Sequence, residues 1–282
     1  MRAPRTPEDA PLAEGARSVA RTRVDGAGAR EAADRVAHEE PLEIQVGGTP
    51  LVVLMRTPGH DEELATGFLV TERVVARPGD LASVRHCDEA PTPEAADNVV
   101  RIRLRPGLRV DLEALRRNLF ASAACGVCGT ATLENVLATA PPLEDPARFP
   151  AALLRSLPGR LREAQRVFDA TGGLHAAGLF DARGRLVVAR EDVGRHNAVD
   201  KVVGFAVREG RFPLAGHLLM VSGRVSYEIV RKALAARCPL VAAVSAPSSL
   251  AVSLAEAGGV GLVGFLRGEA FNVYGARERV LG

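Results

Sequence analysis

Residues 217–265 read HLLMVSGRVSYEIVRKALAARCPLVAAVSAPSSLAVSLAEAGGVGLVGF, and this stretch decides the fold. Short apolar runs of strand length alternate in it with longer runs of helical length. The expected strands are residues 217–221, 240–244 and 261–265, and the expected helices are 226–236 and 248–257. Strands that alternate with helices of these lengths pair in parallel, with the helices as crossovers. The sequence therefore predicts an α/β fold.

The loops that follow these three strands are candidate ligand-binding segments, because in such sheets the ligand crevice lies beyond the carboxyl ends of the strands. They are residues 222–224, 245–248 and 266–269. Each loop has small residues that let backbone N–H groups approach a ligand, and two of them add an arginine suited to phosphate. The same loops could equally be plain turns and helix caps.

A second hairpin and a helix are expected just before this region. Residues 174–179 and 185–188 flank the turn 181–184, and a helical stretch runs from about residue 195 to 207. His175 lies at a glycine-rich strand entry, where the backbone can approach another group closely. A structural histidine with its hydrogen bonds satisfied is the alternative.

The run REDVGRHNAVDK, residues 190–201, gathers many polar groups at the start of that helix. In a structural interpretation Asp192 caps the helix and Asp200 pairs with Lys201 or Arg195. In a functional interpretation Arg195 and His196 hold an anionic ligand or stabilise a nearby thiolate. Both interpretations remain open from the sequence.

The N-terminal half has a different pattern. Residues 42–46 and 51–55 form a hairpin signal around Gly47 and Gly48, residues 60–70 form an amphipathic helix, and residues 98–104 add a strand. These elements predict a mostly antiparallel sheet with one packed helix. The expected organisation is a disordered extension over 1–36, a β-rich part over 37–124 and an α/β part over 125–282.

The motif Cys125-Gly126-Val127-Cys128-Gly129 is the strongest chemical signal in the chain. Residues 130–137 favour a helix, so the two thiols lie near a helix N-terminus, where the dipole lowers a thiolate pKa. Sulfur relay through a persulfide, thiol–disulfide exchange and zinc binding are the three functional readings of such a pair.

Zinc binding is the weakest of these three interpretations. A structural site needs four ligands, but Cys87 and Cys238 stand alone rather than as a second pair. The zinc deaminase signature combines His-x-Glu with Pro-Cys-x-x-Cys, whereas here Ala124 replaces the proline and His38 lies far upstream. No structural metal is expected.

Composition narrows the class of protein. A formal charge of +2 is too small to indicate a nucleic-acid-binding groove. No segment approaches the roughly 20 apolar residues that are needed to span a bilayer. Four cysteines do not make a secreted disulfide framework, and no signal peptide is evident. We therefore expect a cytoplasmic protein that binds neither nucleic acid nor membrane.

Four stretches together resemble the FdhD family, the sulfur carrier and sulfurtransferase accessory proteins of formate dehydrogenases. They are residues 55–65, 125–129, 191–201, and 222–228 with 262–265. Their order and spacing cover residues 39 to about 275. This combination is far more specific than the Cys-x-x-Cys motif alone.

The resemblance implies that the protein takes sulfur from a cysteine desulfurase and passes it to the bis-molybdopterin guanine dinucleotide molybdenum cofactor (Mo-bisMGD) of a formate dehydrogenase. Cys125 then matches the persulfide-bearing cysteine, and Cys128 matches the second cysteine of the motif. The segment that binds the guanine nucleotide of the cofactor aligns with Phe265, Leu266, Arg267, Gly268, Glu269 and Ala270.

The same resemblance implies a homodimer whose core is similar to cytidine deaminases, with a mixed sheet, flanking helices and no catalytic zinc. Two alternatives remain at this stage. One is a chaperone that binds and inserts the molybdenum cofactor without transferring sulfur. The other is a thiol–disulfide oxidoreductase.

Overall fold

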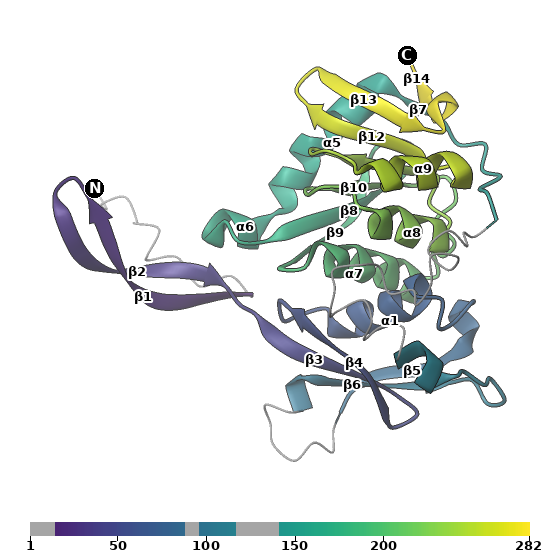
Figure 1. Cartoon of the computed structure of the whole chain (residues 1–282), viewed down its shortest axis with the longest axis horizontal. Coiled ribbons are helices and arrows are strands. Elements are labelled where there is room, and N and C mark those ends of the chain that lie inside the picture. The colour runs from purple at the N-terminus through teal and green to yellow at the C-terminus, as the bar shows by residue number, and fades with distance from the viewer. Residues whose placement is uncertain (1–14, 88–95, 117–140) are drawn as a thin grey trace.

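The computed structural model describes residues 15–87, 96–116 and 141–282 of the 282-residue chain (Figure 1). Its centre is a six-stranded mixed sheet in the order β13-β12-β11-β10-β8-β9. The strands are β8 (His175–Phe180), β9 (Leu186–Asp192), β10 (Leu218–Val221), β11 (Leu240–Ala243), β12 (Gly261–Arg267) and β13 (Ala270–Gly275). Strands β10, β11 and β12 pair in parallel and the other pairs are antiparallel, which confirms the predicted α/β fold.

Helices cover both faces of this sheet. Helices α7 (Arg195–Arg208), α8 (Tyr227–Ala235) and α9 (Ser249–Gly258) pack on one face, and α5 (Ala151–Ala164) packs on the other. Side chains of β10 alternate between the two cores: Leu219 faces the α7–α8 side, and Met220 faces α5. A strand buried on both faces is apolar at every position, which is why residues 218–221 form an unbroken apolar run.

A second sheet forms the lower part of the molecule in Figure 1. Its order is β4-β3-β6-β5, with β3 and β6 parallel and the other pairs antiparallel. The strands are β3 (Glu40–Val46), β4 (Thr49–Arg56), β5 (Leu81–His86) and β6 (Val99–Leu104). Helix α1 (Asp61–Thr71) packs on it, so the predicted hairpin, helix and strand are confirmed.

Helices α1 and α7 pack against each other between the two sheets, and two glycines let their backbones come into contact. A Cβ atom added at Gly67 would lie 1.8 Å from the carbonyl oxygen of Asp200, and one added at Gly204 would lie 1.8 Å from that of Glu63. Only glycine fits at either position. The helices therefore touch backbone to backbone at their crossing.

Residues 15–37 correct the expectation of a disordered extension. They include a hairpin of β1 (Ala16–Asp25) and β2 (Gly28–Ala37) that projects from the body (Figure 1). Its side chains alternate among arginine, alanine and acids and lie mostly exposed, so they give no apolar period from which a strand could be predicted. Residues 1–14 and the predicted boundary at 124/125 lie outside the described residues.

The remaining elements complete the described chain. They are α6 (Arg166–Thr171), the short strands β7 (Phe149–Pro150) and β14 (Val280–Leu281), which pair in parallel, and single 3₁₀ turns at Pro78–Asp80 and Arg277–Arg279. Across residues 15–87, 96–116 and 141–282, none of the helices has the length and apolar character to cross a membrane.

Candidate functional site

The carboxyl ends of the parallel strands meet at one edge of the central sheet, where backbone hydrogen bonds tie their loops together. Val225 N donates to the Ala246 carbonyl (3.1 Å), and Phe265 N donates to the Ser245 carbonyl (3.1 Å). Strand β8 runs antiparallel to β10, so its start at His175 lies at the same edge. Ser222 secures the junction, because its N donates to the Ala176 carbonyl (2.9 Å) and its Oγ accepts from Ala176 N (2.8 Å).

A cleft of about 770 Å³ opens beside this edge. Its walls include residues from α5 and α6, the glycine-rich entry to β8, and the ends of β10 and β11. His175, Ser222 and Val244 line it from the sheet. The volume falls within the usual range of small-molecule and cofactor sites, roughly 300–1,000 Å³.

The segment predicted to bind the cofactor is a tight hairpin rather than a loop. Phe265, Leu266 and Arg267 end β12, and Ala270 starts β13, with a register shift between Gly264 and Arg267. Phe265 has a positive φ of 55° and is 43% exposed. A bulky residue in this conformation at an exposed strand end is uncommon and marks strain of the kind found at functional sites.

Neighbouring side chains hold this hairpin beside the cleft. Arg267 Nε donates to the carbonyl of Val244, a cleft residue (2.8 Å), and Arg155 of α5 donates to the Glu269 carbonyl (3.0 Å). Gly268 has a φ of 55°, which suits the turn. Leu266 is fully buried, so a ligand could reach only its backbone.

Cys125 and Cys128 lie outside the described residues. The two described thiols, Cys87 and Cys238, are buried and free. Burial raises the pKa of Cys238 to about 12, so this thiol stays protonated. Within the described ranges no three His, Cys, Asp or Glu side chains are grouped to hold a metal ion.

Several side chains of the polar run 190–201 are buried in the core. Asp192 is buried against Lys201, whose Nζ lies 2.7 Å from its carboxylate. Its Oδ1 also accepts from the backbone N of Gly194 (2.8 Å) and from Asn197 Nδ2 (2.9 Å), so Asp192 holds the segment before α7. It does not cap the helix as predicted, because the N-cap is Gly194 and no side chain caps it. The prediction that Asp200 pairs with Lys201 or Arg195 is wrong, because Asp200 pairs with Lys232.

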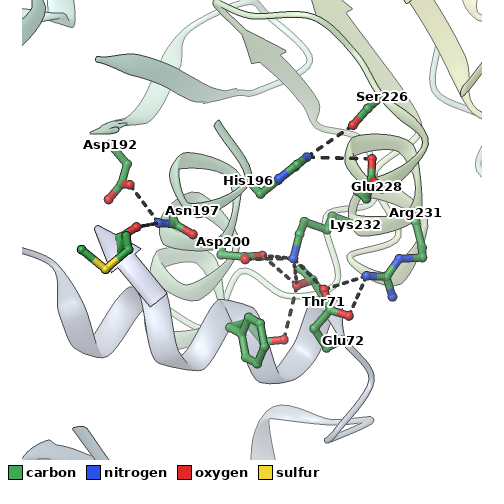
Figure 2. Close-up of polar contacts among 12 residues, drawn as sticks. Thr71, Glu72, Asp192, His196, Asn197, Asp200, Ser226, Glu228, Arg231 and Lys232 are labelled. Carbon is green, nitrogen blue, oxygen red and sulfur yellow. Dashed lines mark hydrogen bonds and ion pairs between the residues drawn. The ribbon is translucent and has the colours of Figure 1, made fainter. Parts of the chain in front are cut away.

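A buried ion network joins α1, α7 and α8 around Lys232, as Figure 2 shows. Lys232 Nζ lies 2.9 Å from carboxylate oxygens of both Asp200 and Glu72, and it also bonds Thr71. Burial raises the pKa of Glu72, but the ion pairs with Lys232 and Arg231 outweigh this effect and lower it to about 2.

His196 lies between α7 and α8, close to this network (Figure 2). Its Nε2 is 3.3 Å from Ser226 Oγ and 3.9 Å from Glu228. Burial and the charges of Lys232 and Arg195 lower the pKa of His196 to about 4, so the ring is neutral at pH 7.

His175 faces two arginines across the backbone of Gly223. A Cβ atom at Gly223 would lie 3.2 Å from His175 Nδ1 and 4.0 Å from Arg195 Cδ. Burial and the charges of Arg195 and Arg224 lower the pKa of His175. The close approach predicted at the glycine-rich entry before His175 occurs at Gly173, where an added Cβ atom would lie 3.2 Å from Ala37 Cβ, whereas the glycine that meets the His175 ring is Gly223.

Comparison with known proteins places this fold and site in a family, since the model of the FdhD/NarQ family matches residues 37–281. The chain belongs to the FdhD/NarQ family. The FdhD/NarQ match starts at the last residue of β2, so it covers both sheets and omits almost all of the projecting hairpin.

Curated relatives within the FdhD/NarQ family match nearly the full chain. The sulfur carrier protein FdhD of Streptomyces coelicolor is 52% identical over 88% of this chain and 89% of its own length. That of Mycobacterium tuberculosis is 49% identical over 88% of this chain and 92% of its own length. A solved structure, described as a formate dehydrogenase accessory protein from Desulfotalea psychrophila, has a TM-score of 0.76 at 25% identity and covers 95% of this chain and 100% of its own.

Two features described above, the buried Lys232 and the cleft wall from α5, were missed by sequence reasoning. Lys232 lies on the polar side of an amphipathic helix, and its charge gives no sign of its burial. The cleft wall from α5 was missed because Pro158-Gly159 reads as a turn. The buried spacing of Leu154, Leu157 and Leu161 is the signal that could have identified this helix.

Proposed function

We propose that this protein is a sulfur carrier that serves the maturation of a formate dehydrogenase. The observation that carries the proposal is the extent of its match to proteins named sulfur carrier protein FdhD, at about half identity over most of both chains. The accessory protein from Desulfotalea psychrophila supports formate dehydrogenase as the client. The Cys125-Gly126-Val127-Cys128-Gly129 motif supplies the thiols for the chemistry.

Cys125 is the proposed acceptor of sulfur from a cysteine desulfurase. Its thiolate attacks the terminal sulfur of the desulfurase persulfide, the S–S bond breaks, and the desulfurase thiolate leaves. The product is a persulfide on Cys125. This first step moves a sulfane sulfur from the desulfurase cysteine to Cys125, so the two proteins together undergo no net oxidation or reduction.

Cys128 gives the second step its electrons. Once the molybdenum cofactor is bound as acceptor, the Cys128 thiolate attacks Cys125 Sγ and releases the terminal sulfur as sulfide, while Cys125 and Cys128 become a disulfide that a cellular dithiol later reduces. Without the cofactor the persulfide stays on Cys125. The sulfide is delivered to the molybdenum of Mo-bisMGD, which is the substrate of the transfer.

The β12–β13 hairpin is the proposed contact for a guanine nucleotide of that substrate. The bond from Arg267 Nε to Val244 leaves the two terminal nitrogens of the guanidinium free among the described residues. These nitrogens and the Gly268 backbone can meet phosphate oxygens. Exposed Phe265 offers an aromatic face beside them. We also propose that the protein acts in the cytoplasm and forms a homodimer.

The experiment that tests this function is intact-protein mass spectrometry after incubation with a cysteine desulfurase and cysteine. We expect a gain of about 32 Da, one sulfur atom, that a thiol reductant removes. Cys125→Ala should lose the gain. Cys238→Ala is the matched control and should keep it, because burial holds that thiol protonated.

The possible outcomes separate the competing functions. A gain that persists in Cys125→Ala moves the carrier role to another thiol and contradicts the assignment. No gain in the wild-type protein favours a cofactor-insertion chaperone. A readily cycled Cys125–Cys128 disulfide without any gain favours a thiol–disulfide oxidoreductase.

A further inference from the structure

Helix α6 forms part of the cleft wall but has little packing of its own. All six of its residues are described, and none of them is fully buried. Phe168 of this helix lines the cleft, as do Gln165 just before it and Gly172 just after it. A helix this short is not stable by itself, because its first turn fixes several residues for one hydrogen bond. Other groups must therefore keep α6 in place.

The side chain of Glu191 in β9 binds the first turn of α6. Its Oε2 accepts from the backbone N of Val167 (2.9 Å), and its Oε1 accepts from the backbone N of Phe168 (2.8 Å). Donors in the first turn of a helix have no intrahelical carbonyl as a partner. A carboxylate beside them also interacts favourably with the helix dipole. One side chain thus satisfies two backbone donors of the cleft wall.

Glu191 is itself fixed to the core of the protein. It lies on β9, where its backbone pairs with Ala176 of β8. The buried Lys201 Nζ lies 3.4 Å from the Glu191 carbonyl oxygen and 2.7 Å from the carboxylate of the next residue, Asp192. Lys201 therefore sets the position of this strand end, and the Glu191 side chain passes that position on to α6.

The environment of Glu191 is not one that favours a charged carboxylate. Burial raises the pKa of Glu191 and outweighs the two backbone N–H groups, which lower it. Asp169 of α6 also raises this pKa, and Arg162 of α5 lowers it. Perturbed carboxyl groups of this kind cluster at functional sites, so stability alone does not explain the placement of Glu191.

We propose that Glu191 is a positioning residue that holds α6 in place as a wall of the ligand-binding cleft. Glu191 acts through α6 and not by touching the ligand. The inference rests on the proposed function, because the β12–β13 hairpin proposed to contact the guanine nucleotide is tied to the same cleft. Arg267 of that hairpin donates to the carbonyl of Val244, which lines the cleft.

Calorimetric titration of the full-length protein with GDP tests this role. Glu191→Ala removes both acceptor oxygens. If α6 is then in place only about a tenth of the time, the apparent affinity for GDP falls about tenfold. Glu191→Gln keeps one acceptor oxygen, so its loss of affinity should be smaller.

The matched control is Asp181→Ala. The carboxylate of Asp181 also accepts from two backbone N–H groups, those of Arg183 (2.9 Å) and Arg185 (3.0 Å). It lies at the turn of the β8–β9 hairpin, whereas Glu191 lies near the other end of the same hairpin. Asp181→Ala should therefore bind GDP with the affinity of the wild-type protein.

Hydrogen exchange separates positioning of α6 from a general loss of stability. In the wild-type protein, GDP should slow exchange of the amides of residues 166–172, because Phe168 lines the cleft. In Glu191→Ala the same amides should exchange faster without GDP, and saturating GDP should slow them again. Amides of β10 and β11 should exchange as in the wild-type protein, because the core is unchanged.

Each outcome decides the inference. An affinity for GDP that is unchanged in Glu191→Ala, or no binding of GDP to the wild-type protein, overturns the positioning role. Equal losses of affinity in Glu191→Ala and Asp181→Ala also overturn it, because general instability then explains both. If Glu191→Ala does not fold, the comparison of Glu191→Gln with Asp181→Asn decides in the same way.

The sulfur gain on Cys125 is measured separately, so the two proposals can fail independently. If Cys125 gains sulfur but the affinity for GDP does not depend on Glu191, the sulfur carrier stands and the positioning role falls. If the affinity depends on Glu191 but Cys125 never gains sulfur, the positioning role stands and the sulfur carrier falls.

Discussion

His196 is a neutral residue in a charged environment, and its titration should be visible in the stability of the protein. Its pKa is about 4 in the folded chain and near 6.5 in the unfolded chain. Between these values the unfolded chain binds a proton that the folded chain does not. The stabilisation is therefore complete above pH 6.5 and is lost as the pH falls towards 4.

We expect the free energy of unfolding to fall by about 1 kcal/mol more between pH 7.5 and pH 5 in the wild-type protein than in His196→Gln. This figure is discounted for screening, because the side chain is 34% exposed. The other charged groups that act on the ring are Lys232, Arg195, Glu228 and Glu72, and all four residues are the same in both proteins. Urea unfolding at the two pH values measures the difference, and parallel slopes would contradict the assignment.

Lys232 should be among the most sensitive residues in the protein. It is 3% exposed and balances the buried carboxylates of Asp200 and Glu72. Lys232→Met leaves the buried Asp200 carboxylate without its cationic partner, whereas Glu72 keeps its ion pair with Arg231, and the expected loss of stability is about 3–5 kcal/mol. Chemical unfolding at pH 7.5 tests this value.

The control for this substitution is Arg185→Met. Its ion pair with Asp181 lies at the surface, with the Arg185 side chain 71% exposed. The change should cost less than about 1 kcal/mol. Equal losses for Lys232→Met and Arg185→Met would show that the buried network is energetically unimportant.

The pairing of Asp200 shows how far residue-level reasoning can go without coordinates. The sequence identifies the polar run at the start of α7 but suggests Lys201 or Arg195 as the partner of Asp200. Consecutive helical side chains point in different directions, so the two residues cannot share a partner surface. Lys201 instead meets Asp192, and Asp200 meets Lys232 from α8, 32 residues further along the chain. Such a long-range pair leaves no local signal.

At the scale of elements, the crossing of α1 and α7 depends on two glycines. Gly67→Ala places a methyl group where the Asp200 carbonyl lies, so the helices must separate. Overpacking against backbone should cost about 3 kcal/mol. Thermal or urea unfolding of the variant measures this cost.

Gly159→Ala in α5 is the matched control for that substitution. Gly159 is also a helical glycine, but nothing lies within 4 Å of an added Cβ atom there. The change should stabilise the protein by about 0.5–1 kcal/mol, because alanine loses less backbone entropy on folding. If both variants lose stability equally, the close approach of α1 and α7 is not the cause of the loss in Gly67→Ala.

Elements with a regular pattern were predictable and irregular ones were not. Strands β10, β11 and β12 are largely apolar runs separated by helices, and their parallel pairing follows from that pattern. Helix α5 contains Pro158, which removes a backbone donor and reads as a helix end. Burial of Leu154, Leu157 and Leu161 on the sheet keeps it helical despite the proline.

At the scale of the whole molecule, the sequence predicts both sheets but not how they join. The junction depends on backbone contact between helices far apart in the chain and on buried charges from three helices. The sequence also predicts which edge of the central sheet carries the candidate site, because that edge follows from the direction of the parallel strands. The cleft also needs the wall that α5 and α6 form, and these two helices were not predicted from the sequence.

The projecting β1–β2 hairpin is the part of the described chain that should open most easily. Both of its faces are largely exposed, and a two-stranded ribbon is at best marginally stable by itself. Its contacts with the body include an ion pair of Arg17 with Glu40 and packing of both strands against α6. Local opening therefore exposes little apolar surface and costs little free energy.

Hydrogen exchange followed by mass spectrometry tests this expectation. Amides of residues 18–35 should exchange by local opening, several orders of magnitude faster than those of β10 and β11, which open only with the whole core. The measurement is repeated after dilution of the protein as a control for association. Slow exchange that persists at every concentration would contradict a free ribbon. Slow exchange that becomes fast on dilution would show that a second copy covers the hairpin.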